Sequence, residues 1–156
     1  MASTLKQLIE TRQVFAVEKG STVRTAAEFM AKNNIGAIPV MEGDRLVGIF
    51  SERDVINRVV SKGLDPAVTT VDLVMTTDLV VASVDDTYEA CLKKMRRGVI
   101  RHLPVVEGDK LVGFISLRDL LQVDISEKDD KLEFLNSYMF HVSPSLEKKY
   151  VKPSKS

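Results

Sequence analysis

Two short motifs contain the side chains with the clearest chemical potential. The sequences SERD at residues 51–54 and SLRD at residues 116–119 each place a serine hydroxyl three residues before a carboxylate. A carboxylate accepts hydrogen bonds from two neighbouring hydroxyls, and such charge-assisted bonds are stronger than neutral ones. Each motif also resembles a capping box at a helix start, where free backbone N–H groups favour an anion. Capping alone accounts for the spacing, so ligand binding and helix capping both remain open.

A second pair of candidates is basic. Arg101 and His102 are suited to a phosphate, because a guanidinium forms bidentate bonds and an imidazole titrates near neutral pH. In the corresponding place near residue 37 the sequence has only Gly36 and Ala37, so we expect two unequal sites, with the better phosphate site at Arg101 and His102. The alternative is a solvated charge at 101 and a half-buried ring at 102.

Composition excludes several function classes. The 22 basic and 22 acidic residues balance, which predicts neither a nucleic-acid nor a membrane partner. The only cysteine is Cys91, and the two histidines, His102 and His141, are far apart, so we expect no disulfide and no metal site. No signal peptide or membrane span is recognisable, and a cytoplasmic location is expected. No activated nucleophile or acid–base pair stands out, which predicts that the chain is not an enzyme.

The elements that must position these residues occur twice. Residues 22–54 align without a gap with residues 87–119, and the recurring residues fall in predicted strands, turns and helix starts. Each copy reads as a strand, a helix, a hairpin with a Gly-Asp turn, and a final helix. The first strands are expected at 14–17 and 79–83, the hairpins at 37–50 and 102–115, and the last helices at 51–60 and 116–123.

The predicted fold is mixed α/β (α+β), with two βαββα subdomains. One copy of fewer than about 60 residues buries too little apolar surface to be stable by itself, so we expect the two to pack sheet to sheet about a pseudo-twofold axis. The expected domains are an N-terminal helix (1–13), the first copy (14–62), a linker with one short turn (63–76), the second copy (77–124), a C-terminal helix (125–140) and a mobile tail (141–156).

The repeated pattern resembles a known family. The sequences IPV and LPV, the Gly-Asp turns, and LVGIFSERD and LVGFISLRD are similar to the cystathionine-β-synthase (CBS) domain, and the tandem resembles a CBS pair, or Bateman module. The resemblance covers about residues 10–124. It implies a binding module for an adenosine-containing regulatory ligand such as AMP, ADP, ATP, NAD or S-adenosylmethionine, with no obligatory cofactor.

The same resemblance implies roles for individual residues. The serine and aspartate of each motif would reach the ribose, the residues before and including the hairpin proline would face the base, and the first strand of each copy would close the adenine pocket. Arg53 and Arg118 are either phosphate ligands or surface charges. The expected ligand-binding residues are Val14, Phe15, Ala16, Ala37, Ile38, Pro39, Ser51, Arg53 and Asp54, and Leu79, Val80, Val81, Arg101, His102, Leu103, Pro104, Ser116, Arg118 and Asp119.

Two functions are compatible with these residues. The first is a sensor that binds an adenine nucleotide and signals to a regulated partner protein through the conformation of a homodimer. The second is a protein–protein docking scaffold whose clefts stay unoccupied. The apolar stripe Leu132, Leu135 and Met139 of the expected C-terminal helix is a candidate dimer element, although it can equally pack back on its own chain.

Overall fold

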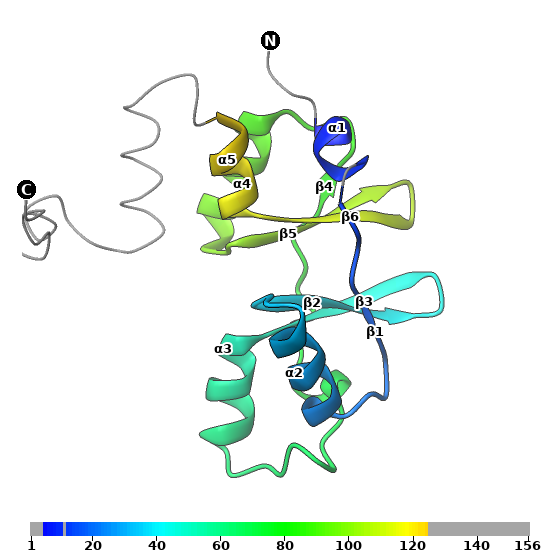
Figure 1. The fold of residues 1–156 in the computed structure, drawn as a ribbon, viewed down its shortest axis with the longest axis vertical. Helices are drawn as coiled ribbons and strands as arrows, with labels where there is room; N and C mark the ends of the chain where they lie inside the picture. Colours follow the sequence, from blue (N-terminus) through cyan, green and yellow to red (C-terminus); the bar gives the residue numbers. More distant parts are fainter. Residues whose placement is uncertain (1–4, 11, 125–156) are drawn as a thin grey trace, which may run out of the picture. The chain divides into compact units, whose positions relative to one another are not determined.

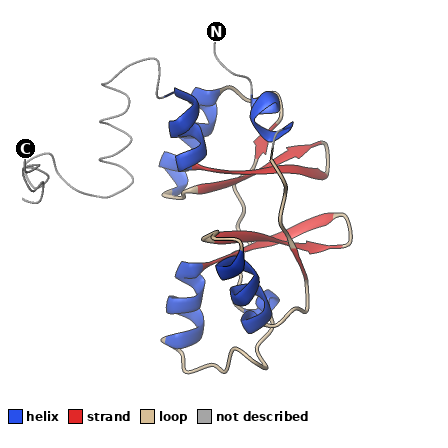
Figure 2. Cartoon of the chain, in the orientation of Figure 1, coloured by secondary structure: helices blue, strands red, loops and turns tan. Residues whose placement is uncertain are grey.

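Two small three-stranded sheets and the helices beside them make up the fold (Figures 1 and 2). The computed structural model describes residues 5–10 and 12–124. The chain divides into two compact units, Met1–Ile115 and Ser116–Ser156. The elements are α1 (Leu5–Glu10), β1 (Val17–Glu18), α2 (Val23–Lys32), β2 (Ala37–Glu42), β3 (Arg45–Ser51), α3 (Glu52–Asp54), η1 (Val55–Val60), η2 (Val71–Leu73), β4 (Ala82–Ser83), α4 (Tyr88–Gly98), β5 (His102–Glu107), β6 (Lys110–Ser116) and α5 (Leu117–Asp124).

Each sheet repeats the same order of strands. In the first sheet β1 runs parallel to β2, and β2 forms an antiparallel hairpin with β3. The second sheet has the order β4–β5–β6, with β4 parallel to β5. The turn residues Gly43 and Gly108 have φ angles of 60° and 62°, a left-handed conformation that glycine adopts without steric cost. The predicted mixed α+β fold with a duplicated unit is therefore confirmed.

The helix after the first strand has the same design in both copies. Thr22 caps α2 by accepting a hydrogen bond from the Thr25 N–H, and Thr87 caps α4 in the same way. One face of α2 is buried, and it packs on the first sheet in a cluster that includes Ile38, Val40 and Phe50. The predicted helical periodicity of both segments is confirmed.

The first strands are shorter than the sequence predicts. The expected strand at 14–17 is mostly loop, with β1 beginning at Val17, and the expected strand at 79–83 is a strand only at Ala82–Ser83. Phe15 explains part of this difference, because its ring makes an edge-to-face contact with Phe29, with centroids 5.6 Å apart. The apolar run at 14–17 therefore serves packing next to the sheet more than pairing within it.

The segment between the copies is part of the core of the first copy. The predicted short turn is present as the 3-10 helix η2, and Val71, Val74 and Met75 are buried in the first copy's apolar cluster. Ile49 and Thr76 exchange two backbone hydrogen bonds of 2.9 and 2.8 Å. A Cβ on Gly48 would lie 2.3 Å from the Met75 sulfur, so glycine at that place leaves room for Met75.

The N-terminal helix has the corresponding place in the second copy. Leu5 and Ile9 of α1 are buried, and a Cβ on Gly113 of β6 would lie 2.5 Å from Cγ2 of Ile9. Gly113 is the repeat equivalent of Gly48, since the second copy follows the first at an offset of 65 residues. Each copy is thus completed by the segment that precedes the other copy in the sequence.

The last helices of the two copies differ. The helix expected at 51–60 divides into the single turn α3 and a π-helix, η1, in which the Ser61 N–H donates to the Ile56 carbonyl oxygen. Ile56 and Val60 of η1 are 63% and 69% exposed. In the second unit, α5 is an α-helix, as predicted. The expected C-terminal helix (125–140), including Leu132, Leu135 and Met139, and the tail (141–156) lie outside the described residues.

We predict that the segment containing η2 contributes to the stability of the whole protein. Val71 is fully buried, so Val71→Ala should lower the free energy of unfolding by roughly 1–3 kcal/mol in urea denaturation. Leu73 lies in the same turn but is 74% exposed, and Leu73→Ala should change it by less than about 0.5 kcal/mol. Equal effects of the two substitutions would contradict a core role for this segment.

A second stability prediction concerns the end of α4. Val99 has φ 51° and is 59% exposed, and a β-branched residue is strained in this left-handed region, whereas its repeat equivalent is Asn34 with φ 54°. Val99→Asn should therefore stabilise the protein by about 1 kcal/mol. The reciprocal change Asn34→Val should destabilise it by a similar amount, with an unchanged denaturant slope in both variants. A loss of stability in Val99→Asn would argue against strain.

Candidate functional site

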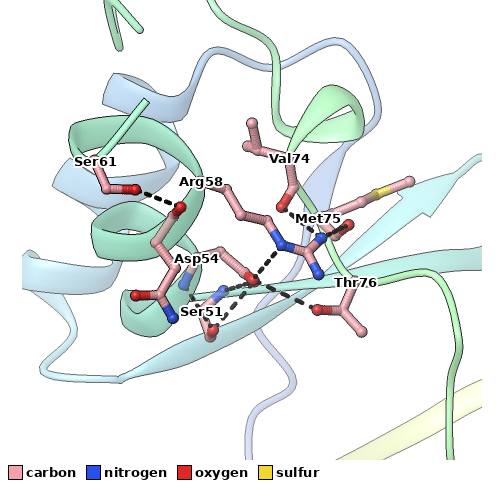
Figure 3. A network of polar contacts seen from close by, with 8 residues as sticks. Ser51, Asp54, Arg58, Ser61, Val74, Met75 and Thr76 are labelled. Atoms are coloured by element: carbon pink, nitrogen blue, oxygen red, sulfur yellow. Dashed lines mark hydrogen bonds and ion pairs between the residues drawn. The ribbon is translucent and has the colours of Figure 1, made fainter. Parts of the chain in front are cut away.

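The motif at residues 51–54 forms a complete capping box at the start of α3 (Figure 3). The Ser51 N–H donates to Oδ2 of Asp54 over 2.9 Å, and the Ser51 hydroxyl donates to the same oxygen over 3.1 Å. In return the Asp54 N–H donates to Oγ of Ser51 over 3.3 Å. The side chain of Asp54 is therefore fixed by its own helix start, as the capping interpretation predicts.

The other carboxylate oxygen of Asp54 also has partners within the chain. Oδ1 lies 3.6 Å from Nε of Arg58 and accepts a hydrogen bond of 3.5 Å from the Thr76 hydroxyl. Arg58 in turn donates from Nη1 to the carbonyl oxygens of Val74 and Met75, over 3.2 and 2.8 Å (Figure 3). Asp54 thereby connects the helix start to the segment that completes the first copy's core.

Two of the donors to Asp54 are hydroxyls, which matters for binding. A carboxylate offers about four acceptor positions, and Asp54 accepts hydrogen bonds from the Ser51 N–H and from the hydroxyls of Ser51 and Thr76, while Arg58 is its ion-pair partner. The N–H and the guanidinium fix the orientation of the carboxylate, whereas the two hydroxyls can rotate. Two hydroxyls of a bound sugar could take the places of these two donors without an unpaired acceptor remaining.

The motif of the second copy has the same core geometry. The Ser116 N–H donates to Oδ2 of Asp119 over 2.7 Å, and the Asp119 N–H donates to Oγ of Ser116 over 3.1 Å. Asp119 is half-buried, whereas Asp54 is only 6% exposed. Val123 occupies the repeat position of Arg58, so the guanidinium contact seen at Asp54 has no counterpart from this position.

The hairpin residues predicted to face a base are mostly buried. Ala37 is the register partner of Ser51 across the first hairpin, which brings these two predicted site residues together. Ile38, Pro39, Leu103 and Pro104 are buried. His102 is half-buried and stacks on Phe114 of the neighbouring strand, with ring centroids 5.6 Å apart and an angle of 15° between the planes.

The basic candidates and the pocket-closing loops are more accessible. Arg53, Arg101 and Arg118 are exposed. In the loops before β1 and β4, the exposed residues are Ala16 and Val80, and the half-buried ones are Val14, Phe15, Leu79 and Val81. Their ligand contacts stay a prediction.

One polar network near the second copy's loop was missed by the sequence analysis. Lys94 of α4 donates to the Val81 carbonyl oxygen over 2.9 Å and to Oδ2 of Asp86 over 2.6 Å. Asp86 also accepts a 3.1 Å hydrogen bond from the Ser83 N–H. The hydrogen bond from Lys94 is the main reason why the pKa of Asp86 lies below its usual range. Lys94 thus holds the loop that was predicted to close an adenine pocket.

The thiol of Cys91 is buried and unreactive. Cys91 is fully buried, and this burial, together with the charge of Asp86, raises its pKa to about 11. A thiol with this pKa is protonated near neutral pH and is a poor nucleophile.

Within residues 5–10 and 12–124, no three His, Cys, Asp or Glu side chains are grouped so that they could hold a metal ion. None of the helices in the same part of the chain has the length and apolar character needed to cross a membrane.

We predict that the Lys94–Asp86 pair stabilises the native state in a pH-dependent way. The native pKa of Asp86 is depressed, so its contribution is present above the unfolded pKa of about 3.9 and is lost as the pH falls through the native pKa. Asp86→Asn should cost about 1 kcal/mol at pH 7 in urea denaturation, since Lys94 is 37% exposed. This difference should shrink below about pH 4. The neighbouring exposed Asp85→Asn is the control, and an equal pH-independent loss in both variants would contradict the prediction.

Comparisons with known proteins agree with this architecture. A family model described as CBS domain matches residues 5–61 and 70–126, so the two matches begin with α1 and with the segment that contains η2. The CBS domain-containing protein YhcV of Bacillus subtilis is 38% identical over 110 residues, which cover 70% of this chain and 78% of that protein.

Solved structures give the same result. A CBS-domain containing protein from Agrobacterium tumefaciens is 29% identical with a TM-score of 0.71, and the match covers 77% of this chain and 98% of that one. A CBS domain protein from Pyrobaculum aerophilum, solved in complex with AMP, is 27% identical with a TM-score of 0.70 over 86% of this chain and 99% of that one.

Proposed function

The chain belongs to the CBS domain family, and from this we propose that it is a regulatory module that binds an adenosine-containing ligand through its two Ser-x-x-Asp motifs. The relative from Pyrobaculum aerophilum that carries AMP supports this choice of ligand class. We propose no catalytic role. The thiol of Cys91 is buried and protonated, and Asp54 is engaged by structural partners.

The observation that carries the proposal is the arrangement of donors around Asp54. Its carboxylate is oriented by one backbone N–H and one guanidinium, and its remaining acceptor positions hold two hydroxyls. A ribose with vicinal hydroxyls would replace those two donors in kind. The exchange would also release Thr76, which belongs to the segment connecting the copies.

The second copy is proposed as the better site for a phosphate. Arg101 is exposed and has a guanidinium suited to bidentate contacts with phosphate oxygens. His102, the next residue in the chain, is half-buried and stacks on Phe114, and an aromatic ring favours contact with a planar base. AMP, ADP, ATP, NAD and S-adenosylmethionine all contain the adenosine that this proposal requires.

The proposed output is a change of conformation that a partner protein detects. A ligand can shift a conformational equilibrium only by the difference between its affinities for the two states. We propose that this occurs in a homodimer in the cytoplasm, and that the dimer geometry conveys the ligand state to the regulated protein.

A docking scaffold is the alternative function, and one observation favours it. The chain itself already supplies Asp54 with three hydrogen-bond donors and an ion-pair partner, so its place in the motif is stable without a ligand. A module that serves only to bind another protein would need nothing more from this residue.

Isothermal titration with AMP, ADP, ATP, NAD and S-adenosylmethionine distinguishes the two functions. We expect at least one ligand to bind with a dissociation constant well below about 1 mM, and to raise the melting temperature by linkage. Asp54→Ala and Asp119→Ala should each reduce binding at one site, at a stability cost of about 1–2 kcal/mol, because the serine N–H loses its acceptor in the capping box.

Asp54→Asn and Asp119→Asn are the matched variants, because the asparagine side-chain oxygen can still accept the serine N–H bond of the capping box, whereas the charge is removed. Reduced affinity in the asparagine variants, with melting temperatures above those of the alanine variants, would separate binding from capping. Blank titrations across the ligand series would instead favour the docking scaffold, and unchanged affinity in all four variants would leave the motifs as caps.

A further inference from the structure

The two copies differ in charge at two pairs of equivalent positions in the repeat. Arg101 in the second copy corresponds to Gly36 in the first, and Leu117 in the second corresponds to Glu52 in the first. The second copy therefore has a cation in front of its hairpin proline and an apolar residue after its serine. The first copy has no side chain at the former position and a carboxylate at the latter.

The structure brings Glu52 and Gly36 together. The Glu52 N–H donates to the Gly36 carbonyl oxygen over 2.9 Å, so the start of α3 is attached to the residue before β2. A Cβ built on Gly36 would lie 3.2 Å from Oε1 of Glu52 and 3.6 Å from Oε2. The carboxylate thus lies beside Gly36, whose repeat equivalent in the second copy is Arg101.

Two arginines lie near the first motif, and of these only Arg58 has no basic equivalent in the second copy, where Val123 stands. Arg53 is exposed, but Arg118 is exposed at the same position of the second copy, so this cation does not distinguish them. Arg58 lies 3.6 Å from Asp54 and donates to two backbone carbonyl oxygens, so its charge is already directed to those groups. The area around residues 36 and 52 is consequently more negative than its repeat equivalent.

We propose that Glu52 is a specificity-determining residue that makes the first copy's site select adenosine ligands without an anionic 5′ group. The inference rests on the proposed function. The suitable ligand class is a neutral nucleoside or a positively charged adenosyl sulfonium, and AMP or ATP is disfavoured there. The protein would accordingly respond to two chemically different adenosine compounds, an anionic one at the second copy and an uncharged or cationic one at the first.

Coulomb's law sets the size of the effect. Two like charges about 5 Å apart at a partly solvated surface should alter affinity about tenfold. Because Glu52 is exposed, added salt should reduce the effect, with a screening length of about 10 Å at 0.1 M ionic strength.

An NMR titration of the full chain with adenosine, AMP and S-adenosylmethionine tests the proposal. The amides of Gly36 and Ser51 report the first copy, and those of Arg101 and Ser116 report the second. At low salt we expect the first copy to bind adenosine about tenfold more tightly than AMP, and S-adenosylmethionine at least as tightly as adenosine. In Glu52→Gln the affinities for adenosine and AMP should become nearly equal, and the affinity for S-adenosylmethionine should fall.

Glu89→Gln is the matched control, since it removes the charge of an exposed glutamate in α4 and should leave all affinities of the first copy unchanged. Equal affinity of the parent protein for adenosine and AMP at the first copy, or a Glu52→Gln variant with the parent's selectivity, would overturn the inference while the proposed function stands. Binding at the second copy alone would likewise overturn the inference while the proposed function stands. Absence of binding at both copies would overturn the proposed function, and the inference with it.

Discussion

The fold depends on one packing constraint. The core of each copy packs against the segment that precedes the other copy in the sequence. Val71, Val74 and Met75 lie in the apolar cluster of the first copy. Ile9 of α1 occupies the space that a side chain at Gly113 in β6 would need. A small βαββα unit buries little apolar surface, so these added side chains supply part of what each copy lacks. The glycines at 48 and 113 are needed because any larger residue would occupy the space that Met75 and Ile9 fill.

The first copy's motif is connected to the same constraint. Arg58 joins the carboxylate of Asp54 to the carbonyl oxygens of Val74 and Met75, and the Thr76 hydroxyl reaches the same carboxylate. The side chain that we propose to bind a sugar therefore also contacts the segment that links the copies. In the second copy Val123 replaces this arginine, so the two motifs share their hydrogen bonds to serine, but that position can supply a guanidinium only in the first copy.

The sequence predicts what local patterns determine, and it misses what depends on distant contacts. Hairpins, helix caps and the SERD and SLRD helix starts follow from turn residues and periodicity, and the structure has them at nearly the predicted positions. The Arg58–Asp54 pair could have been found from its spacing of four residues on a helix. The role of residues 69–76 in the core, the loop character of residues 14–16 and the Lys94–Val81 contact could not, because their partners are far away in the sequence. The π-helix η1 also has no sequence signal that we can identify.

Because the copies exchange segments, the fold does not depend on an unbroken backbone between them. Residues 61–68 are all exposed, and a cut within them would separate the chain into two pieces. The downstream piece would retain Val71 and Met75, which fill the upstream piece, and the upstream piece would retain α1, which covers β6 of the downstream piece. The two pieces would interlock through noncovalent contacts in both directions, so the native fold would tolerate a nick there as a two-part complementing system.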